Sequence, residues 1–304
     1  MRAATATIGT TGHRRARSGP GPSERSSKGA SQDMDRARSV TPSEVDVSTP
    51  SVARMYDFYL GGKDNYEVDR QACAALSEAA PGTAALAINN RRFLIRAVRY
   101  LAQEHGIRQF LDHGSGLPTQ DNVHQVAQAV DPAARTVYID NDPIVLAHGR
   151  ALLEQDDAST VVQADVRDFA SIYSDPEVTR LLDFSKPTAA LFLSFLHCIP
   201  DSDDPAGLVS DVLDRLPKGS VVVISHLASN DPEVRRSLTD MMLANTGGNW
   251  GRVRTPDEVE AMFGGLSVVE PGIVEVSTWH PDDVAPEVQA TKEWIEYGGV
   301  AFKN

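Results

Sequence analysis

The run FLDHGSG, residues 110 to 116, constrains this chain more than any other feature. Its apolar start is typical of a buried strand, and the strand ends in an acid followed by the spacing Gly-x-Gly. Glycine has no Cβ, so it can adopt positive φ and let the backbone approach a ligand closely. The pattern therefore predicts a strand and a tight loop that holds a nucleoside cofactor.

The missing third glycine separates the possible cofactors. A dinucleotide site has the pattern G-x-G-x-x-G, but position 119 of this chain is Thr119. Asp112 inside the motif would repel a pyrophosphate and attract a cationic amino acid group. S-adenosylmethionine has an ammonium, a sulfonium and no phosphate. The charge pattern therefore favours S-adenosylmethionine over NAD.

Asp140 supplies the second half of the predicted site. It ends the apolar run TVYI, residues 136–139, which is typical of a strand buried on both faces. A carboxylate there can accept hydrogen bonds from both hydroxyls of a ribose. Taken alone, an acid-x-Gly-x-Gly run is equally compatible with a purely structural turn.

Composition limits the classes of function. The chain has 304 residues, 23% of them charged and 41% apolar, which suits a globular enzyme. No stretch approaches the ~18 consecutive apolar residues of a membrane span. Two distant cysteines, Cys73 and Cys198, favour a reducing, cytoplasmic compartment. The net charge of −13 disfavours binding to nucleic acid or to anionic membranes, so we expect a small-molecule partner.

Residues 1–50 differ from the rest of the chain. They hold eight basic and five acidic side chains among many Ser, Thr, Gly, Pro and Ala residues, with almost no large apolar ones. This composition predicts a disordered tail; a transit peptide, or a true start at Met34, would explain it equally well. We expect one domain over residues 51–304, in which helices at 69–80 and 90–104 belong to an N-terminal helical cap spanning 51–105.

Strands and helices alternate after the cap, as in a parallel sheet covered on both faces. The turn signal Pro271-Gly272 predicts that the last two strands form an antiparallel hairpin. The expected strands are residues 107–112, 136–140, 160–163, 188–196, 220–226, 266–270 and 273–278.

Five blocks of sequence in this order resemble one known family, the bacterial S-adenosylmethionine-dependent methyltransferases formerly catalogued as a domain of unknown function. The resemblance covers residues 50–280 approximately. The blocks are GGKDN at 61–65, NRRFL at 90–94, FLDHGSGLPT at 110–119, VYIDNDP at 137–143 and ADVRD at 164–168.

The resemblance implies an α/β class I methyltransferase fold, a Rossmann-like, mostly parallel sheet of seven strands in the order 3-2-1-4-5-7-6. It also implies which residues bind S-adenosylmethionine. Asp112, Gly114 and Gly116 would line the methionine moiety, with Ser115 where the family usually has Thr. Asp140 would hold the ribose. Asn141 would flank the adenine, and Asp165 with the backbone of Val166 would meet its amino group.

For four other candidate residues the sequence is compatible with a functional and a structural role. Asn65 follows two glycines that could hinge a lid over the cofactor, although a helix end and turn would look the same. Arg91, with Asn90, could reach the cofactor carboxylate or simply start a helix. His197 and His226 follow or end apolar strands at the edge where ligands bind, so they are candidate general bases or else structural histidines. A metal site of His113, His197 and His226 is disfavoured because these residues lack close ligand spacing.

The predicted function is methyl transfer from S-adenosylmethionine to a small-molecule acceptor. Two alternatives use the same fold: an enzyme that catalyses a non-methyl reaction such as cyclisation or elimination, and a non-catalytic protein that only binds the cofactor. Several histidines around one pocket would favour the first alternative, and a pocket closed to any acceptor would favour the second.

Overall fold

The computed structural model describes residues 46–119, 121–153, 156–283, 286–287 and 294–304. Most of the predicted tail, residues 1–45, lies outside the described part, and the domain boundary near residue 50 stays a prediction. In the part of the chain that is described, no helix has the length and apolarity needed to cross a membrane.

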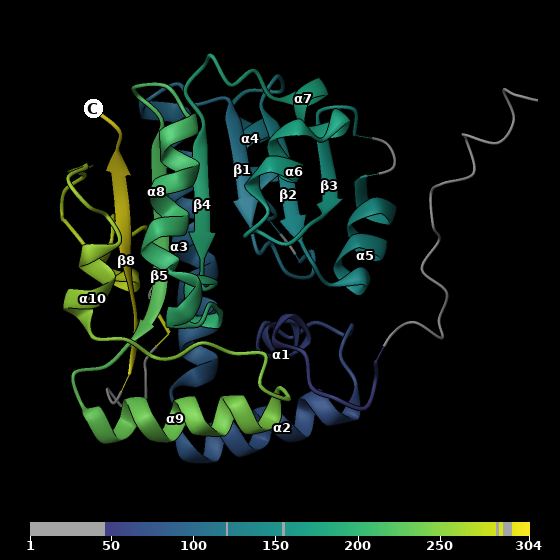
Figure 1. The fold of residues 1–304 in the computed structure, drawn as a ribbon, viewed down its shortest axis with the longest axis vertical. Coiled ribbons are helices and arrows are strands. Elements are labelled where there is room, and N and C mark those ends of the chain that lie inside the picture. Colours follow the sequence, from purple (N-terminus) through teal and green to yellow (C-terminus); the bar gives the residue numbers. More distant parts are fainter. Residues whose placement is uncertain (1–45, 120, 154–155, 284–285, 288–293) are drawn as a thin grey trace, which may run out of the picture. The chain divides into compact units, whose positions relative to one another are not determined.

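A single eight-stranded sheet forms the centre of the protein, with the order β3-β2-β1-β4-β5-β8-β6 and with β7 also paired to β8 (Figure 1). The strands β1 to β5 are parallel, and β8 runs antiparallel to β5. The bounds are β1 Gln109–His113, β2 Arg135–Asp140, β3 Ser159–Gln163, β4 Ala189–Leu193, β5 Val221–Ala228, β6 Ser267–Val268, β7 Val274–Glu275 and β8 Ile295–Phe302. This confirms the predicted class I methyltransferase fold, with β8 in the position of the expected seventh strand.

The predicted hairpin at residues 266–278 is wrong. Only two residues of each expected strand are extended, and β6 and β7 pair with β8 instead of with each other. The sequence pattern missed β8 because Gly298 and Gly299 interrupt its apolar run, as in a turn. Gly298 is needed for close packing, since a Cβ there would lie 2.1 Å from the carbonyl oxygen of Ile224.

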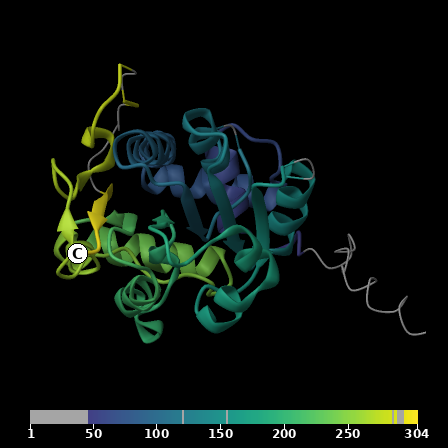
Figure 2. The ribbon, with the colours of Figure 1, turned by 90° about the horizontal axis from the view of Figure 1, so that it is seen from above.

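Helices cover both faces of the sheet (Figure 2). One face packs on α3 and α4 around Phe110, Leu191 and Val223, and the other packs on α6, α7, α8 and α10 around Leu111, Phe192 and similar residues. Helix α5 also contacts strand β3. The bounds are α3 Thr83–Glu104, α4 Val123–Val130, α5 Pro143–Leu153, α6 Phe169–Ser174, α7 Pro176–Leu181, α8 Pro205–Arg215 and α10 Pro256–Ala261.

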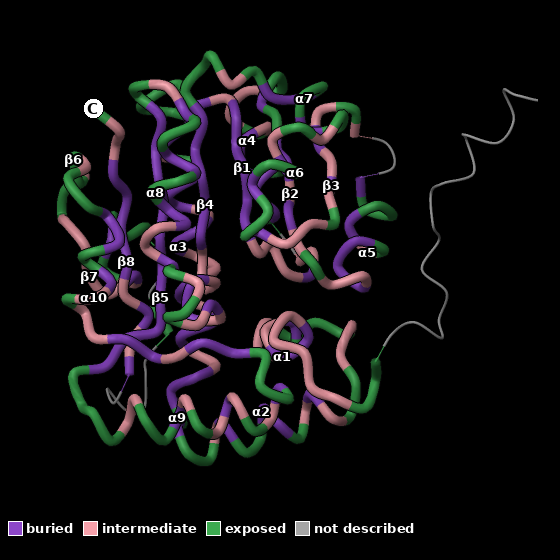
Figure 3. The backbone as a smooth tube through the Cα atoms, viewed as in Figure 1, coloured by how far each residue is buried: buried purple, intermediate pink, exposed green. Residues whose placement is uncertain are grey.

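Three further helices, α1 Val52–Tyr59, α2 Glu67–Ala79 and α9 Pro232–Asn245, lie across the carboxyl ends of the parallel strands (Figure 1). They share a separate apolar cluster that includes Met55, Leu76, Met242 and Trp250. Burial follows this arrangement, because the central strands are buried along most of their length and α9 has exposed residues along its outer side (Figure 3). The cap over the sheet edge therefore combines N-terminal helices with a helix from the second half of the chain.

Candidate functional site

The loop after β1 is folded tightly against its neighbours. Gly114 has φ 67° and Gly116 has φ 65°, the left-handed conformation that favours glycine. The Gly114 amide donates to the carbonyl oxygen of Ile139 on β2 at 2.8 Å. A Cβ on Gly114 would lie 2.0 Å from the ring of Phe195, so the close approach of these two segments requires glycine.

Asp140 connects the loops that follow β1 and β2. Its carboxylate accepts hydrogen bonds from the Gly116 amide at 2.9 Å and from the Asp142 amide at 2.9 Å. Burial raises the pKa of Asp140, although these backbone donors act in the opposite direction. The carboxylate at the end of β2 is therefore fixed in place beside the glycine loop, as expected for a group that must meet a ligand in one orientation.

Asp112 is the most deeply buried acid of the loop, with 5% of its surface exposed. Burial raises its pKa to about 7, and the nearby Arg91 guanidinium partly offsets this effect. Arg91 projects from α3 and donates to Asn122 Oδ1 at 3.1 Å. An acid and a guanidinium on the wall of one cavity are complementary to the ammonium and carboxylate of a free amino acid group.

These residues line one cavity of about 680 Å³ at the carboxyl edge of the sheet, a volume typical of small-molecule sites. Nine of the ten predicted cofactor residues lie on its wall: Arg91, Asp112, Gly114, Ser115, Gly116, Asp140, Asn141, Asp165 and Val166. The wall is completed by residues from other segments, including Tyr56, Asn90, Ser194, Phe195, Cys198 and Trp250.

The loop after β3 contributes Asp165 and Val166 to the cavity. Asp165 is paired with Arg167, with Oδ2 and Nη2 2.5 Å apart, and this hydrogen bond lowers its pKa. The side chain of Val166 packs in the sheet core, which fixes the position of its backbone on the cavity wall. Asn141, between the β2 and α5 segments, is exposed.

A family model described as S-adenosyl methyltransferase matches residues 38–304. The chain belongs to this family. S-adenosylmethionine is accordingly its cofactor, and its activity is S-adenosylmethionine-dependent methyl transfer.

Two solved structures are similar along almost their whole length. A candidate methyltransferase from Thermobifida fusca YX is 42% identical, with a TM-score of 0.79, over 88% of this chain and 100% of the other. A DUF574 family protein from Streptomyces avermitilis MA-4680 is 39% identical, with a TM-score of 0.79, over 85% of this chain and 99% of the other. No curated protein matches.

The donor set of this S-adenosyl methyltransferase fits the cofactor. The glycine loop leaves open space at Gly116, where a Cβ would meet no atom within 4 Å. The acids Asp112 and Asp140 face the same cavity as Arg91, which provides opposite charges for a zwitterionic amino acid and an acceptor for a ribose. The cavity is therefore suited to a phosphate-free nucleoside with a charged amino acid end.

Asn65 does not line the cavity. Its amide nitrogen donates to Asp57 Oδ2 at 2.8 Å and to the Gly62 carbonyl oxygen at 3.1 Å, and its Oδ1 accepts from Arg70 Nη1 at 3.0 Å. These bonds fix the turn between α1 and α2. The arrangement is the helix end and turn that the sequence analysis gave as the alternative to a lid.

His197 and His226 are both buried, and neither side chain lines the cavity. His197 Nδ1 accepts from the Leu227 amide at 3.3 Å. His226 lies between the Leu227 carbonyl oxygen, 2.7 Å from Nδ1, and Arg254 Nη1, 2.9 Å from Nε2. Burial lowers the pKa of His226 to about 3 and that of His197 well below its ordinary value. Both rings therefore stay neutral in the folded protein and hold the backbone at the end of β5.

His113 points to the other side of β1 from Asp112. Its ring stacks on Phe192 with centroids 4.4 Å apart, and Nδ1 lies 3.3 Å from the Leu191 carbonyl oxygen. Its ring therefore points away from the cavity that Asp112 lines. In the part of the chain that the structure describes, no cluster of three or more His, Cys, Asp or Glu residues could hold a metal ion.

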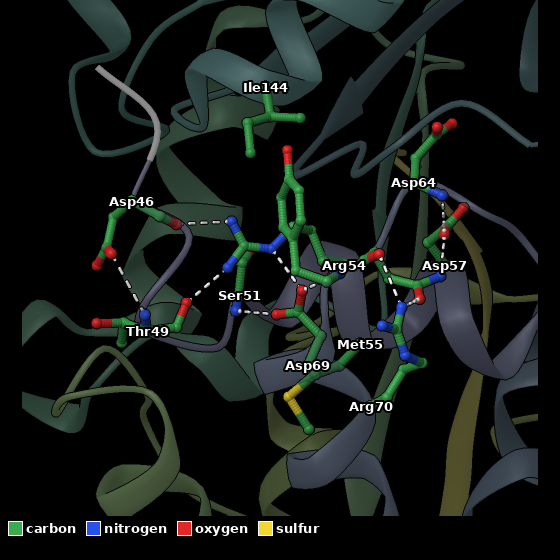
Figure 4. A network of polar contacts seen from close by, with 12 residues as sticks. Asp46, Thr49, Ser51, Arg54, Met55, Asp57, Asp64, Asp69, Arg70 and Ile144 are labelled. Carbon is green, nitrogen blue, oxygen red and sulfur yellow. Dashed lines mark hydrogen bonds and ion pairs between the residues drawn. The ribbon is translucent and has the colours of Figure 1, made fainter. Parts of the chain in front are cut away.

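The sequence analysis missed one wall of the cavity, formed by residues 46–54, which we call the strap. Arg54, with 2% of its surface exposed, holds it in place (Figure 4). Its guanidinium donates to Asp69 Oδ2 at 2.8 Å, to the Asp46 carbonyl oxygen at 2.9 Å and to the Thr49 carbonyl oxygen at 2.5 Å. The only signal in the sequence is a cation within an apolar helix.

Ser51 connects the strap to the cofactor loops. Its amide donates to Asp69 Oδ1 at 2.9 Å and its hydroxyl to Asp142 Oδ2 at 3.1 Å. Asp142 in turn donates its amide to Asp140. A short chain of hydrogen bonds therefore runs from α2 through the strap to the acid at the end of β2.

Proposed function

We propose that this enzyme methylates a small-molecule acceptor and that S-adenosylmethionine lies along the ends of β3, β2 and β1. In this arrangement Asn141, Asp165 and the backbone of Val166 hold the adenine, and Asp140 holds the ribose. Asp112, Arg91 and the loop from Gly114 to Gly116 hold the methionine end. The observation that carries the proposal is that Asp112 and Asp140 lie on the wall of one cavity.

The bound cofactor supplies an electrophilic methyl group on a sulfonium. Methyl transfer is an in-line displacement, so the protein must orient the acceptor toward the methyl group and exclude water from the site. Asp112 provides a negative charge for the ammonium, and burial strengthens this interaction. Strap residues line the cavity, where they would help to exclude water from the bound cofactor.

A small acceptor agrees with the size of the cavity and with the net charge of −13. Asn65, His197 and His226 are not part of the proposed set, because their side chains do not line the cavity. The non-methyl alternative depended on histidines gathered around one pocket, and His113, His197 and His226 are not on its wall. The cytoplasmic location predicted from cysteine usage stays a prediction.

Calorimetry with S-adenosylmethionine and NAD tests the cofactor site. We expect Asp140→Asn to weaken S-adenosylmethionine binding by about 1.5–3 kcal/mol, the range for a hydrogen bond to a charged group. Asp211→Asn, at an exposed position on α8, is the matched control and should bind as the wild type does. Tight NAD binding, or an unchanged affinity in Asp140→Asn, would contradict the proposed site.

S-adenosylhomocysteine formation tests the acceptor class. The wild-type enzyme is incubated with S-adenosylmethionine and a panel of phenols, alcohols, amines and carboxylic acids, and product is quantified for each. Turnover of at least one member is expected. Turnover of oligonucleotides or peptides only would contradict the small-molecule assignment.

A further inference from the structure

This inference rests on the cofactor position proposed above. Given that position, the order of the strands indicates where the methyl group of the cofactor lies. Adenine, ribose and methionine follow β3, β2 and β1 in turn, and the next strand along is β4. Ser194 directly follows β4, has φ 53° and lies on the cavity wall. The sulfonium end of the cofactor therefore faces the segment that contains Ser194.

A chain of hydrogen bonds with a fixed direction lies beside Ser194. The Tyr56 hydroxyl donates to the Ala87 carbonyl oxygen at 3.1 Å, and Asn90 Nδ2 donates to the Tyr56 oxygen at 2.9 Å. Asn90 Oδ1 is an acceptor only, so the Ser225 hydroxyl donates to it, at 2.6 Å. Ser225 Oγ has thereby used its single proton, and it accepts from the Ser194 amide at 2.8 Å.

This series of hydrogen bonds leads to the carboxyl group of Glu296. This residue lies on β8 opposite Leu227 and has 1% of its surface exposed, and the hydroxyls of Ser194 and Ser225 are close enough to lower its pKa by donating to it. The proton of Ser225 is already donated to Asn90, so the proton that can reach this carboxyl group is the one on the Ser194 hydroxyl. Oε1 of Glu296 has no hydrogen-bond partner among the described residues.

The surroundings of Glu296 favour a bound proton. The titratable groups near it are Glu275 of β7, Tyr56 of α1 and Cys198 after β4, and the charge of Arg91 on α3 lowers the pKa of Tyr56. Burial raises the pKa of Glu296 to about 8, which outweighs the effect of its hydrogen bonds. A carboxyl with a pKa this close to neutrality is suited to exchange protons during turnover.

We propose that Glu296 accepts the proton of the methyl acceptor through the hydroxyl of Ser194. The acceptor heteroatom forms a bond to the methyl carbon as the bond from carbon to sulfur breaks, and that electron pair stays on the sulfur. The acceptor proton passes to Ser194 Oγ, the Ser194 proton passes to the Glu296 carboxylate, and Glu296 returns it to solvent after product release. Ser194 touches the acceptor, and Glu296 acts through it.

This relay selects a class of acceptor. It is useful only for a heteroatom that carries a proton it must lose, such as the hydroxyl of a phenol or an alcohol. A carboxylate acceptor, already ionised at neutral pH, gains nothing from it. The enzyme should therefore prefer hydroxyl acceptors within the panel described above.

The test compares wild type with Glu296→Gln, Glu296→Asp and Ser194→Ala. In Glu296→Gln the amide has nearly the shape of the protonated acid and keeps an oxygen that can accept from the Ser194 hydroxyl, so the fold and S-adenosylmethionine binding should be kept, the latter within about 3-fold by calorimetry. With a hydroxyl acceptor, kcat should fall about 100-fold or more, the range for loss of general-base catalysis. Wild-type kcat should rise with pH through about 8, and this dependence should vanish in Glu296→Gln.

The remaining variants separate a proton role from a structural one. Glu296→Asp should recover part of the rate, Ser194→Ala should lose it with cofactor binding kept, and Glu270→Gln, at an exposed position, should match the wild type. Wild-type kcat in Glu296→Gln or an unchanged pH profile would overturn the inference.

An acceptor-free measurement makes failure of the inference distinct from failure of the proposed function. The infrared band of a protonated carboxyl, assigned by its loss in Glu296→Gln, should be present near neutral pH and disappear with a midpoint at about 8. A Glu296 already ionised at neutral pH would overturn the relay for any acceptor. No turnover of the whole panel by the wild type, with this band present, would instead contradict the small-molecule function.

Discussion

Two buried ionisable side chains, Glu296 and His226, should make the folding stability of this enzyme depend on pH. Glu296 has its pKa raised to about 8 and His226 has its pKa lowered to about 3, in both cases mainly by burial. Each therefore stays neutral in the folded protein over a pH range in which the unfolded chain would ionise it. Folding stability must vary with pH across those ranges, with opposite signs for the two residues.

Glu296 should lower stability as the pH rises. Between its ordinary pKa, near 4.5, and about 8, the folded protein holds a proton that the unfolded chain has lost, so the free energy of unfolding falls with increasing pH. Glu296→Gln removes this dependence. We expect the variant to be more stable than wild type at pH 8 by about 1–3 kcal/mol and to differ little near pH 4, as measured by urea unfolding. An equal pH slope in both proteins would contradict this assignment.

His226 should make the protein sensitive to acid. Below pH 6.5, the ordinary pKa of histidine, His226 is protonated in the unfolded chain, whereas in the folded protein it stays neutral down to about pH 3. The free energy of unfolding therefore falls as the pH drops through this range. His226→Gln keeps one acceptor for Arg254 and one donor for the Leu227 carbonyl. Its unfolding free energy should therefore depend less on pH, by up to about 1.4 kcal/mol per pH unit, whereas the exposed His105→Gln control should follow the wild type.

At the scale of elements, the proposed site depends on two short segments that line the cavity, the glycine loop after β1 and the strap. The loop is held by its close contact with Phe195, and the strap by the buried pair of Arg54 and Asp69. Neither segment is part of a regular strand or helix along its whole length. Changes there should affect cofactor binding more than they affect the sheet.

Gly114→Ala should abolish most cofactor binding. The substitution places a Cβ within 2.0 Å of the Phe195 ring in addition to the strain of a positive φ. Gly219→Ala has a similar strain at φ 82° but ordinary contact, 3.6 Å from Pro187, so it is the matched control. We expect both variants to lose about 1–2 kcal/mol of stability from strain, but only Gly114→Ala to lose S-adenosylmethionine affinity in calorimetry.

Arg54→Lys should speed the release of cofactor. Lysine keeps the charge beside Asp69 but cannot donate to the Asp46 and Thr49 carbonyls in the planar geometry of a guanidinium. Stopped-flow binding should show a dissociation rate for S-adenosylmethionine about 10-fold higher or more, as expected for loss of a hydrogen bond to a charged group. Arg70→Lys, in an exposed pair with Glu67, provides the comparison and should release cofactor at the wild-type rate.

The cofactor side of the site could be predicted because its signals are local. Glycines, acids and strand ends within a few residues of each other define the loops that contain Asp112 and Asp140. The strap and Glu296 could not be predicted, because each depends on long-range burial of a polar group. His226 shows a third limit: β5 continues to Ala228, so this residue lies within the strand and faces the side opposite Ser225.

At the scale of the whole molecule, the cofactor cavity joins the sheet to the helical cap. Its wall includes residues of the sheet edge, of the strap, of α1 and α3, and of the segment after α9. A ligand in the cavity therefore contacts both parts at once. Binding should stabilise the cap relative to the sheet as well as the protein as a whole.

Hydrogen exchange tests this coupling. At about 100 times the dissociation constant, S-adenosylmethionine should add about 2.7 kcal/mol to the stability of the folded state. Amides of the strap and α1 should exchange more slowly with the cofactor present, whereas amides of α7, on the far side of the sheet from the cap, should change only as much as global unfolding requires (Figure 1). Equal protection of α1 and α7 would argue against a local closure of the cap.

The antiparallel strand β8 follows every other strand along the chain, yet it lies inside the sheet between β5 and β6. While the ribosome is still adding residues before 295, β5 is an open edge with unpaired backbone groups, and Glu296 has not yet reached Ser194. An open edge strand of this kind can pair with a strand of another chain and so cause aggregation. The sheet therefore cannot close until residues 295–302 have been made, and chains shortened before residue 295 should form aggregation-prone fragments.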